Sequence, residues 1–444
     1  MEKEAKRLAV MTLGCKVNQY ETQALKERFR DLGYMIVDED QFAEIYVINT
    51  CTVTGLSDKK SRQYIRRAKR INPEAVTVVA GCYAQVSPDE AAGIEGVDIV
   101  CGTNEKTRLP QYVDEFLKTR QKIRRVRPFE SLTEYEESGI ITSMESRTRA
   151  FIKIQEGCDR FCSYCIIPYA RGAVRSRKRA DIISEAEHLI SKGFRELVLT
   201  GINTALYISE NGTPGLYDII GAIDGLPGDF RIRLGSLEPT VIDADYVERL
   251  LGFEKLCPHM HLSLQSGSDS VLERMNRHYS VADYKRIVEI LRSHDAGYGI
   301  TTDIITGFPG ETDEEFEATK EVIKEIRFSK VHVFKYSKRG GTKAAVMPGQ
   351  ISSQIKAERS AELINLSDKA AAAFFDSLSG TVRQVLFEEF DPTGRGYEGF
   401  SDNYIKIHAK AADQDGGRLL NRFADVRLEA AYNDGMTGRI ESNK

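Results

Sequence analysis

The sequence lacks long apolar runs and a strong excess of either charge. No stretch of about 18 apolar residues occurs, which excludes an ordinary membrane-spanning helix. The first residues, MEKEAKRLAVMTLGCK, have neither the long apolar region nor the small-residue cleavage site of a secretory signal. We therefore expect a cytoplasmic protein with no membrane partner. The formal net charge of −4 gives no overall sign of a nucleic-acid partner.

Positive charge is nevertheless concentrated in three short runs. Each run alone is compatible with a solvated helix face or a linker. Three runs near cysteine motifs favour a polyanionic partner. The runs comprise Lys59, Lys60, Arg62, Arg66, Arg67, Lys69 and Arg70, then Lys118, Arg120, Lys122, Arg124, Arg125 and Arg127, then Arg171, Arg175, Arg177, Lys178 and Arg179.

Cysteine is scarce, and its spacing is uneven. The chain has 8 cysteines, an even number that would allow disulfides. A cytosolic chain of this size does not need disulfides for stability. Three of the cysteines fall within eight residues in the middle of the chain, and this spacing points to a metal instead.

Residues 1–117 alternate between strand-like apolar runs and helix-like stretches, which predicts a small α/β domain with a mostly parallel sheet. Cys15, Cys51 and Cys82 each follow a strand-like run. Because the carboxyl ends of parallel strands meet at one edge, we expect these cysteines to converge there. The strand-like runs are Leu8–Leu13, Ile45–Asn49, Val76–Ala80 and Val97–Cys101, and the helices are expected at about Glu21–Leu32 and Asp58–Ile71.

Three further segments follow. Residues 118–148 are charged and weakly periodic, and we expect a linker with some strand content. Residues 149–375 alternate strands and helices in six units, which predicts a partial TIM-type barrel, (β/α)6. Residues 376–444 have short strand-like runs separated by Gly, Asp and Asn, which predicts a small antiparallel β-barrel of OB-like size. The predicted fold class is therefore α/β and multidomain.

The central cysteines, Cys158, Cys162 and Cys165, form the motif CxxxCxxC after a strand-like run. Three thiolates can hold three corners of a [4Fe–4S] cluster and leave the fourth iron open to a ligand. Structural zinc is the alternative, but zinc normally takes four closed ligands. No His or fourth Cys lies nearby in the sequence, and Cys257 is distant. The spacing therefore favours iron and sulfur.

This motif resembles the radical S-adenosylmethionine (SAM) superfamily. The resemblance implies that SAM binds the open iron and is cleaved to a 5′-deoxyadenosyl radical, with Tyr164 touching the adenine. It also implies cofactor contacts at later strand ends, although each such residue could be an ordinary turn or cap. The expected contacts are Thr200, Gly201, Asn203, Ser236, Glu238 and Gln265, together with Ser263, Ser266 and the glycine-rich stretch Ile304–Glu311.

Cys15 in TLGCKVNQYET, Cys51 in NTCTVT and Cys82 in GCYAQ resemble the N-terminal domain of the methylthiotransferase family. The resemblance implies a second, auxiliary [4Fe–4S] cluster on these three cysteines and the insertion of CH₃S at an unactivated C–H bond. SAM would then serve both as radical source and as methyl donor. An electron donor such as a flavodoxin or ferredoxin and a source of sulfur are also implied. Cys101 and Cys257 match neither set, and we expect structural thiols there.

The residues around both cysteine sets, GCKVNQYET and KIQEGCDRFCSYCIIPYARGAVRSR, resemble the branch that modifies threonylcarbamoyladenosine in tRNA. This implies methylthio addition at C2 of that base, at position 37 beside the anticodon. The alternatives are isopentenyladenosine in tRNA, an aspartate of a ribosomal protein and, more remotely, a non-catalytic iron–sulfur RNA-binding regulator.

The last segment resembles a TRAM barrel, a class that would bind the anticodon loop by stacking and charge. It is not basic in total, with nine Lys and Arg against twelve Asp and Glu from Asp376 onward. RNA binding there would need a local patch formed by Lys406, Lys410, Arg418 and Arg422.

Overall fold

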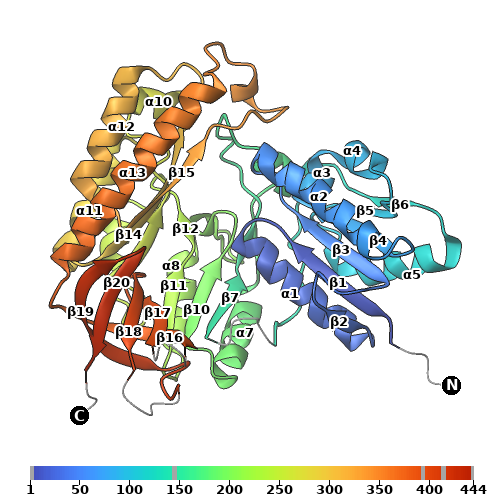
Figure 1. Cartoon of the computed structure of the whole chain (residues 1–444), viewed down its shortest axis with the longest axis horizontal. Helices are drawn as coiled ribbons and strands as arrows, with labels where there is room; N and C mark the ends of the chain where they lie inside the picture. The colour runs from blue at the N-terminus through green and yellow to red at the C-terminus, as the bar shows by residue number, and fades with distance from the viewer. Residues whose placement is uncertain (1–4, 143–147, 392–395, 412–416, 442–444) are drawn as a thin grey trace.

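Three folded units follow one another in the computed structural model, which describes residues 5–142, 148–391, 396–411 and 417–441. Figure 1 shows the N-terminal unit in blue to cyan beside the central unit, and the C-terminal barrel in red packed below the central strands. The predicted multidomain α/β architecture is confirmed.

The N-terminal unit is a six-stranded sheet in the order β2-β1-β3-β4-β5-β6, and every neighbouring pair is parallel. Strands β3 and β4 are mostly apolar and wholly buried, as central parallel strands usually are. Strand β6 comes from the segment 118–148, so the sheet extends beyond residue 117. The strands are β1 Arg7–Thr12, β2 Met35–Val37, β3 Ile45–Thr50, β4 Val76–Gly81, β5 Ile99–Cys101 and β6 Ile123–Arg125. The helices are α1 Lys16–Asp31, α2 Gly55–Ile71, α3 Cys82–Val86, α4 Pro88–Gly93 and α5 Leu109–Thr119, with 3₁₀ turns η1 Lys106–Arg108 and η2 Phe129–Ser131.

The central unit is an open parallel barrel. Its sheets have the orders β11-β10-β7 and β12-β13-β14-β15, and β11 and β12 are separated only by Gly235. Counting β11 and β12 as one broken strand gives the six predicted βα units. The strands are β7 Arg149–Lys153, β10 Glu196–Thr200, β11 Arg231–Leu234, β12 Ser236–Leu237, β13 His259–Leu262, β14 Gly299–Thr306 and β15 Lys330–Lys335, with an antiparallel ribbon of β8 Gln155–Glu156 and β9 Arg175–Ser176.

The helices of this unit cover the outside of the strands and enclose one large apolar core. Helices α11 and α12 begin with capping boxes in which Ser280 and Thr312 satisfy backbone N–H groups. The helices are α6 Ile167–Arg171, α7 Arg179–Ser191, α8 Leu216–Asp224, α9 Ala244–Leu250, α10 Asp269–Arg274, α11 Val281–His294, α12 Asp313–Ile326 and α13 Ser353–Ser377, with 3₁₀ turns η3 Thr204–Leu206 and η4 Lys343–Ala345.

The C-terminal unit is a closed barrel in the order β16-β17-β18-β20-β19. Four of its pairings are antiparallel, as predicted, but β18 and β20 are parallel. The difference arises because the hairpin of β19 and β20 places β20, rather than β19, beside β18. The strands are β16 Val382–Asp391, β17 Gly396–Ser401, β18 Lys406–Lys410, β19 Phe423–Tyr432 and β20 Gly435–Ile440.

A buried charge cluster joins this barrel to the central sheet. Glu196 accepts hydrogen bonds from Arg231 Nε at 2.6 Å and from Arg233 Nε at 2.7 Å. The same arginines donate onward to barrel carbonyls, Arg231 to Phe400 at 3.0 Å and Arg233 to Asp402 at 3.0 Å. Burial opposes ionisation of Glu196, but Arg233 and Arg231 hold its pKa well below the usual range. Its stabilising effect is therefore present at neutral pH and is lost as the pH falls through the lowered pKa.

Substituting Glu196 with Gln should therefore lower the free energy of unfolding by about 3 kcal/mol, because two buried arginines lose their counter-charge. Limited proteolysis should release the C-terminal barrel earlier, and thermal unfolding should begin at a lower temperature. The matched control is Glu317→Gln, since Glu317 pairs with Lys320 on the surface of α12 with 57% of its side chain exposed. An equal effect of the two substitutions would contradict the assigned role of Glu196.

Candidate active site

The central cysteines lie in one loop between β8 and α6. The backbone N–H of Cys158 donates to the carbonyl of Gly172 at 3.1 Å, which closes the base of the loop. Gly157 has φ +73°, and a Cβ at this position would lie 1.8 Å from the carbonyl oxygen of Ala173. Only glycine fits this close approach, so the loop conformation is specified by its own sequence.

The far side of the loop is fixed by the segment after α10. The backbone N–H of Ser163 donates to the carbonyl of Met275 at 2.9 Å. Arg277, with only 6% of its side chain exposed, donates through Nη1 to the Cys162 sulfur at 3.3 Å and lies 3.4 Å from a Glu238 oxygen. A guanidinium therefore faces one of the three thiols from inside the protein.

The scattered cysteines converge as predicted. Cys15 follows β1, Cys51 follows β3 and Cys82 follows β4, and these strands are neighbours in the parallel sheet. The three thiols lie close together: besides burial, the charge on Cys15 helps to raise the pKa of Cys51, and Cys51 and Cys15 help to raise that of Cys82. Gly14 and Gly81 have φ +104° and +98°, and a Cβ on Gly14 would lie 2.9 Å from the Cys51 sulfur. The glycines therefore leave room for the sulfur atoms at this edge.

Arg171 connects the two cysteine sets, a role that no sequence pattern predicted. It lies at the end of α6, directly after the central loop, and is fully buried. Its Nε donates to the Cys82 sulfur at 3.2 Å. Its Nη1 donates to Glu21 at 2.6 Å and to Glu156 at 2.9 Å, and its Nη2 donates to Asn18 at 2.6 Å. One side chain of the central unit thus contacts a cysteine and two further residues of the N-terminal unit.

Two lysines complete this buried network. Lys106 contacts Glu21 and donates to Asn49 at 2.9 Å, while Lys153 lies 2.9 Å from Glu21 and also pairs with Glu156. Burial opposes the charge on Glu21, but Arg171, Lys106 and Lys153 hold its pKa well below the usual range. Glu21 is therefore ionised at neutral pH.

Both cysteine sets fit an iron–sulfur cluster. Chiefly through burial, the pKa of Cys158 and of Cys165 is raised to about 12 and that of Cys82 to about 11. Such thiols stay protonated unless bound iron stabilises the thiolates. Each set also has an arginine N–H directed at one of its sulfur atoms, the kind of hydrogen bond that tunes a cluster.

Two of the predicted SAM contacts lie beside the central loop. Tyr164 and Gln265 line a cavity of about 190 Å³ together with Cys165, Asp303 and Ile305. Gln265 has φ +69°, and its N–H donates to the carbonyl of Asp303 at 2.8 Å, so the end of β13 bends over β14. Ser266 is buried and lies 3.4 Å from a hydroxyl of Thr319 in α12, so it contacts the outer helix layer rather than this cavity.

The other predicted contacts form two groups. Asn203 donates to Glu238 at 2.8 Å, and Glu238 also lies 3.3 Å from Arg160 of the central loop. The Oδ1 atom of Asn203 is buried without a partner among the described residues. Thr200, Gly201 and Ser236 instead line a cavity of about 600 Å³ that also includes Cys15.

The third basic run is mostly buried and offers little surface to a polyanion. Arg171, Arg175 and Arg177 are buried, and only Lys178 and Arg179 are exposed. Arg177 pairs with Glu185 and donates to Glu137 at 2.9 Å. These arginines pack the segment 118–142 between the two units, because their carboxylate partners lie there and in the adjacent elements.

Comparisons with known proteins agree with this architecture. Residues 152–323 match the model of the Radical SAM superfamily, and residues 7–102 match that of the Uncharacterized protein family UPF0004. The threonylcarbamoyladenosine tRNA methylthiotransferase MtaB of Bacillus subtilis is 42% identical over 437 residues, covering 98% of this chain and 96% of that protein. The chain belongs to the methylthiotransferase family.

Other members of the family are similar over comparable lengths. MtaB of Thermotoga maritima is 35% identical, and the match covers 97% of this chain and 96% of that protein. A tRNA-2-methylthio-N(6)-dimethylallyladenosine synthase of Caldicellulosiruptor saccharolyticus is 32% identical, and the match covers 97% of this chain and 92% of that protein. The structure of the radical SAM methyltransferase TsrM of Kitasatospora setae superposes with a TM-score of 0.56 at 17% sequence identity. The match covers 77% of this chain and 75% of TsrM and shows that the two folds are alike.

As a methylthiotransferase, the chain works with SAM and [4Fe–4S] clusters. Six cysteines and two buried arginines provide donors suited to two clusters. None of the helices in the described ranges has both the length and the apolar character needed to cross a bilayer.

The assignment of the six cysteines predicts the iron content of the protein. Reconstituted wild-type protein should hold about eight iron atoms per chain as two cubanes, and Cys158→Ala or Cys15→Ala should each lose about half. Iron and acid-labile sulfide analysis measures this directly. Cys257→Ala is the matched control, because Cys257 is buried beside Arg233 away from both sets and should keep all the iron. Full iron retention in Cys15→Ala would contradict the auxiliary site.

Proposed function

We propose that this protein adds a methylthio group to C2 of N6-threonylcarbamoyladenosine at position 37 of tRNA. The proposal is supported by relatives named for this activity that match nearly the whole chain at 35–42% identity. The matches named for dimethylallyladenosine are 31–34% identical, which makes that base the second candidate substrate. A tRNA substrate also agrees with the cytoplasmic location expected from the sequence.

The observation that carries the proposal is the cavity of about 600 Å³ where the three units meet. It is lined by Cys15 of the N-terminal unit, by Thr200 and Ser236 at strand ends of the central unit, and by Phe400 and Tyr404 of the barrel. Its volume is in the range of ligand sites. A base extruded from a single-stranded loop would fit such a space and would lie between both cysteine sets.

When bound, the two clusters and SAM would supply hydrogen abstraction at C2 and the methylthio group itself. The protein's contribution is to hold and orient. Arg171 fixes the two units against each other and donates to Cys82, while Arg277 donates to Cys162. The charged groups of the buried network around Glu21 have partners from both units, so the network does not depend on water for its hydrogen bonds.

We assign SAM binding to the predicted contacts that surround the central loop. Tyr164 and Gln265 would enclose the adenine and ribose in the smaller cavity, and Asn203 with its unpartnered Oδ1 would receive the amino group. Glu238 belongs to the same cluster and holds Arg160 and Arg277 near the cysteines. Thr200, Gly201 and Ser236 would line the passage from SAM to the substrate base.

We assign tRNA contacts to the aromatic face of the barrel and to the first basic run. Tyr404 stacks on Phe400 with ring centroids 5.1 Å apart, and Arg233 lies 4.5 Å from the Tyr404 centroid. Lys59, Lys60, Arg66 and Arg70 of α2 are exposed and would meet phosphates. A flavodoxin or ferredoxin as electron donor and an exogenous sulfur source complete the proposal.

An anaerobic assay with tRNA that carries threonylcarbamoyladenosine should distinguish the roles of the two cysteine sets. Wild-type protein should form both 5′-deoxyadenosine and the 2-methylthio nucleoside, measured by mass spectrometry. Cys158→Ala should form neither, because the radical source is lost. Cys15→Ala should still form 5′-deoxyadenosine without the methylthio product, because only sulfur delivery is lost.

Product on dimethylallyladenosine tRNA with none on threonylcarbamoyladenosine tRNA would overturn the substrate assignment. The substrate assignment would also be overturned if a deletion strain that has no paralogue kept its full content of 2-methylthio-threonylcarbamoyladenosine. Absence of 5′-deoxyadenosine from the reduced wild-type protein would favour a non-catalytic regulator.

A further inference from the structure

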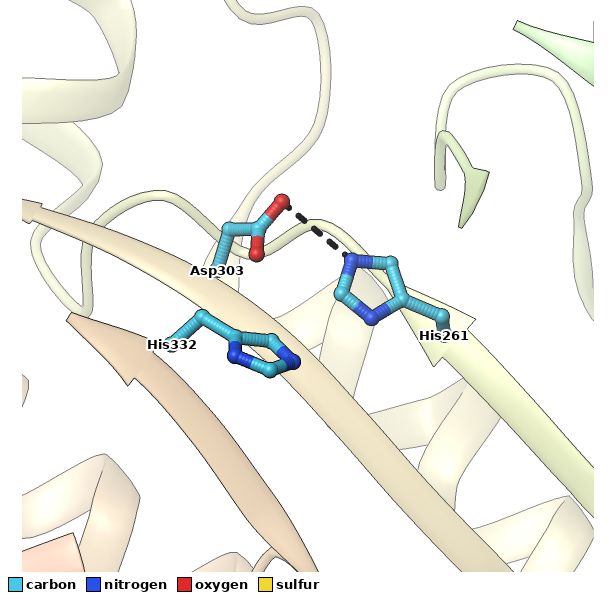
Figure 2. A group of neighbouring side chains, drawn as sticks. All are labelled: His261, Asp303 and His332. Atoms are coloured by element: carbon cyan, nitrogen blue, oxygen red, sulfur yellow. Dashed lines mark hydrogen bonds and ion pairs between the residues drawn. The ribbon is translucent and has the colours of Figure 1, made fainter. Parts of the chain in front are cut away.

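Three polar side chains from adjacent strands face one another in the cavity of about 600 Å³. Asp303 of β14 is in register with His332 of β15, and His261 lies one strand further along on β13. Figure 2 shows the ring of His332 turned toward the space occupied by the other two side chains. The Nε2 atom of His261 lies 3.2 Å from an Asp303 oxygen, and the His261 and His332 ring centroids are 5.9 Å apart.

A chain of hydrogen bonds behind this group orients His261. Thr301 Oγ1 lies 3.1 Å from Nε2 of His259 and 3.0 Å from Nδ1 of His261. His259 is neutral, because burial and then Arg233 hold its pKa well below the usual range. Its Nε2–H can donate to Thr301, the Thr301 hydroxyl to His261, and the Nε2–H of His261 to Asp303. In this order Asp303 acts as an acceptor, and its second oxygen can accept a further hydrogen bond from a ligand.

Two lysines add positive charge to the same cavity. Lys16 comes from the first turn of α1, next to Cys15, and Lys330 begins β15. Neither lysine has an ion-pair partner within the part of the chain that the structure describes. Lys406, which also lines the cavity, is paired with Glu398 at 2.8 Å. Burial, His261 and these two lysines together lower the pKa of His332, although Asp303 opposes the change.

The ligand that suits this arrangement carries a negative charge together with hydrogen-bond donors. Two unpaired ammonium groups favour a carboxylate or another anion. The Asp303 carboxylate favours N–H or O–H groups placed close to that anion. An apolar ligand would desolvate all of these groups without replacing their hydrogen bonds, which is strongly unfavourable.

Building on the proposed function, we propose that this cavity binds the threonine part of N6-threonylcarbamoyladenosine. Lys16 and Lys330 meet its carboxylate, and Asp303 and His332, with Asp303 oriented by His261, meet its hydroxyl and N–H groups. The dimethylallyl group has none of these groups. A site built to hydrogen-bond a substrate rejects an analogue that lacks the bonding groups far more strongly than an apolar pocket does. These residues therefore determine specificity within the family's chemistry.

His261, Asp303 and His332 also have the composition of a two-histidine, one-carboxylate metal site, and their ligand atoms lie within 4.8 Å of one another. The positive charges of the two lysines, Lys16 and Lys330, disfavour binding of a divalent cation at this position. In addition, Nε2 of His261 already has Asp303 as its partner. The charges therefore favour an anionic ligand over a metal ion.

The experiment compares anticodon stem-loops that carry threonylcarbamoyladenosine, dimethylallyladenosine or plain adenosine at the same position. Affinity is measured by fluorescence anisotropy and kcat/KM by product formation, for wild-type protein and for Lys16→Gln, Lys330→Gln and His332→Gln. Each lysine variant should lose about 10- to 100-fold in kcat/KM on the threonylcarbamoyl substrate, as expected for one charge-assisted hydrogen bond. Affinity for that stem-loop should fall in parallel, while affinity for the plain adenosine stem-loop should change less than about twofold for loss of one exposed charge.

The matched control is Lys324→Gln, because Lys324 pairs with Glu321 on the outer surface of α12. It should leave all three substrates unchanged. If the wild type acts on threonylcarbamoyladenosine and the cavity variants keep its full preference, this inference fails and the proposed function stands. If the wild type prefers dimethylallyladenosine, both fail. If the wild type bound one zinc ion per chain and His332→Gln lost it, the cavity would be a cation site and the inference would be overturned.

Discussion

The rest of the site depends on the buried guanidinium of Arg171. It reaches from the central unit into the N-terminal unit and satisfies Glu21, Glu156, Asn18 and the sulfur of Cys82 at once. An arginine with no exposed surface is costly unless every donor has a partner, and here the partners come from both units. The relative position of the two cysteine sets is thus fixed by charge pairing across the interface rather than by apolar contact alone.

Sequence patterns predicted much of the fold because its elements have local signatures. Strands β3 and β4 begin at the predicted residues, Ile45 and Val76, and Cys15, Cys51 and Cys82 follow predicted strands. Helix α13 and strand β6 were not predicted as such. The alanine-rich part of α13 and its buried Ser360 and Ser367 weaken the apolar periodicity, and β6 is a three-residue edge strand with two exposed arginines.

The charged part of the site could not be predicted in the same way. Arg171 and Glu21 are 150 positions apart, and nothing local distinguishes a buried arginine from an exposed one in a basic run. For the basic run that contains Arg171, the sequence therefore left two interpretations open, a solvated face or linker and a contact for a polyanion. His259 and His261, like Thr301 and Asp303, are two residues apart in the sequence, so each pair shares a face wherever its segment forms a strand. The pairing of those two strands, which brings the four side chains together, needed the structure.

Helix α6 has a consequence for electron flow. It begins two residues after Cys165 and ends at Arg171, whose Nε–H donates to the sulfur of Cys82. One short helix and one hydrogen bond therefore connect Cys165 of one set to Cys82 of the other. With the proposed clusters bound, this connection would join them through the protein rather than through solvent.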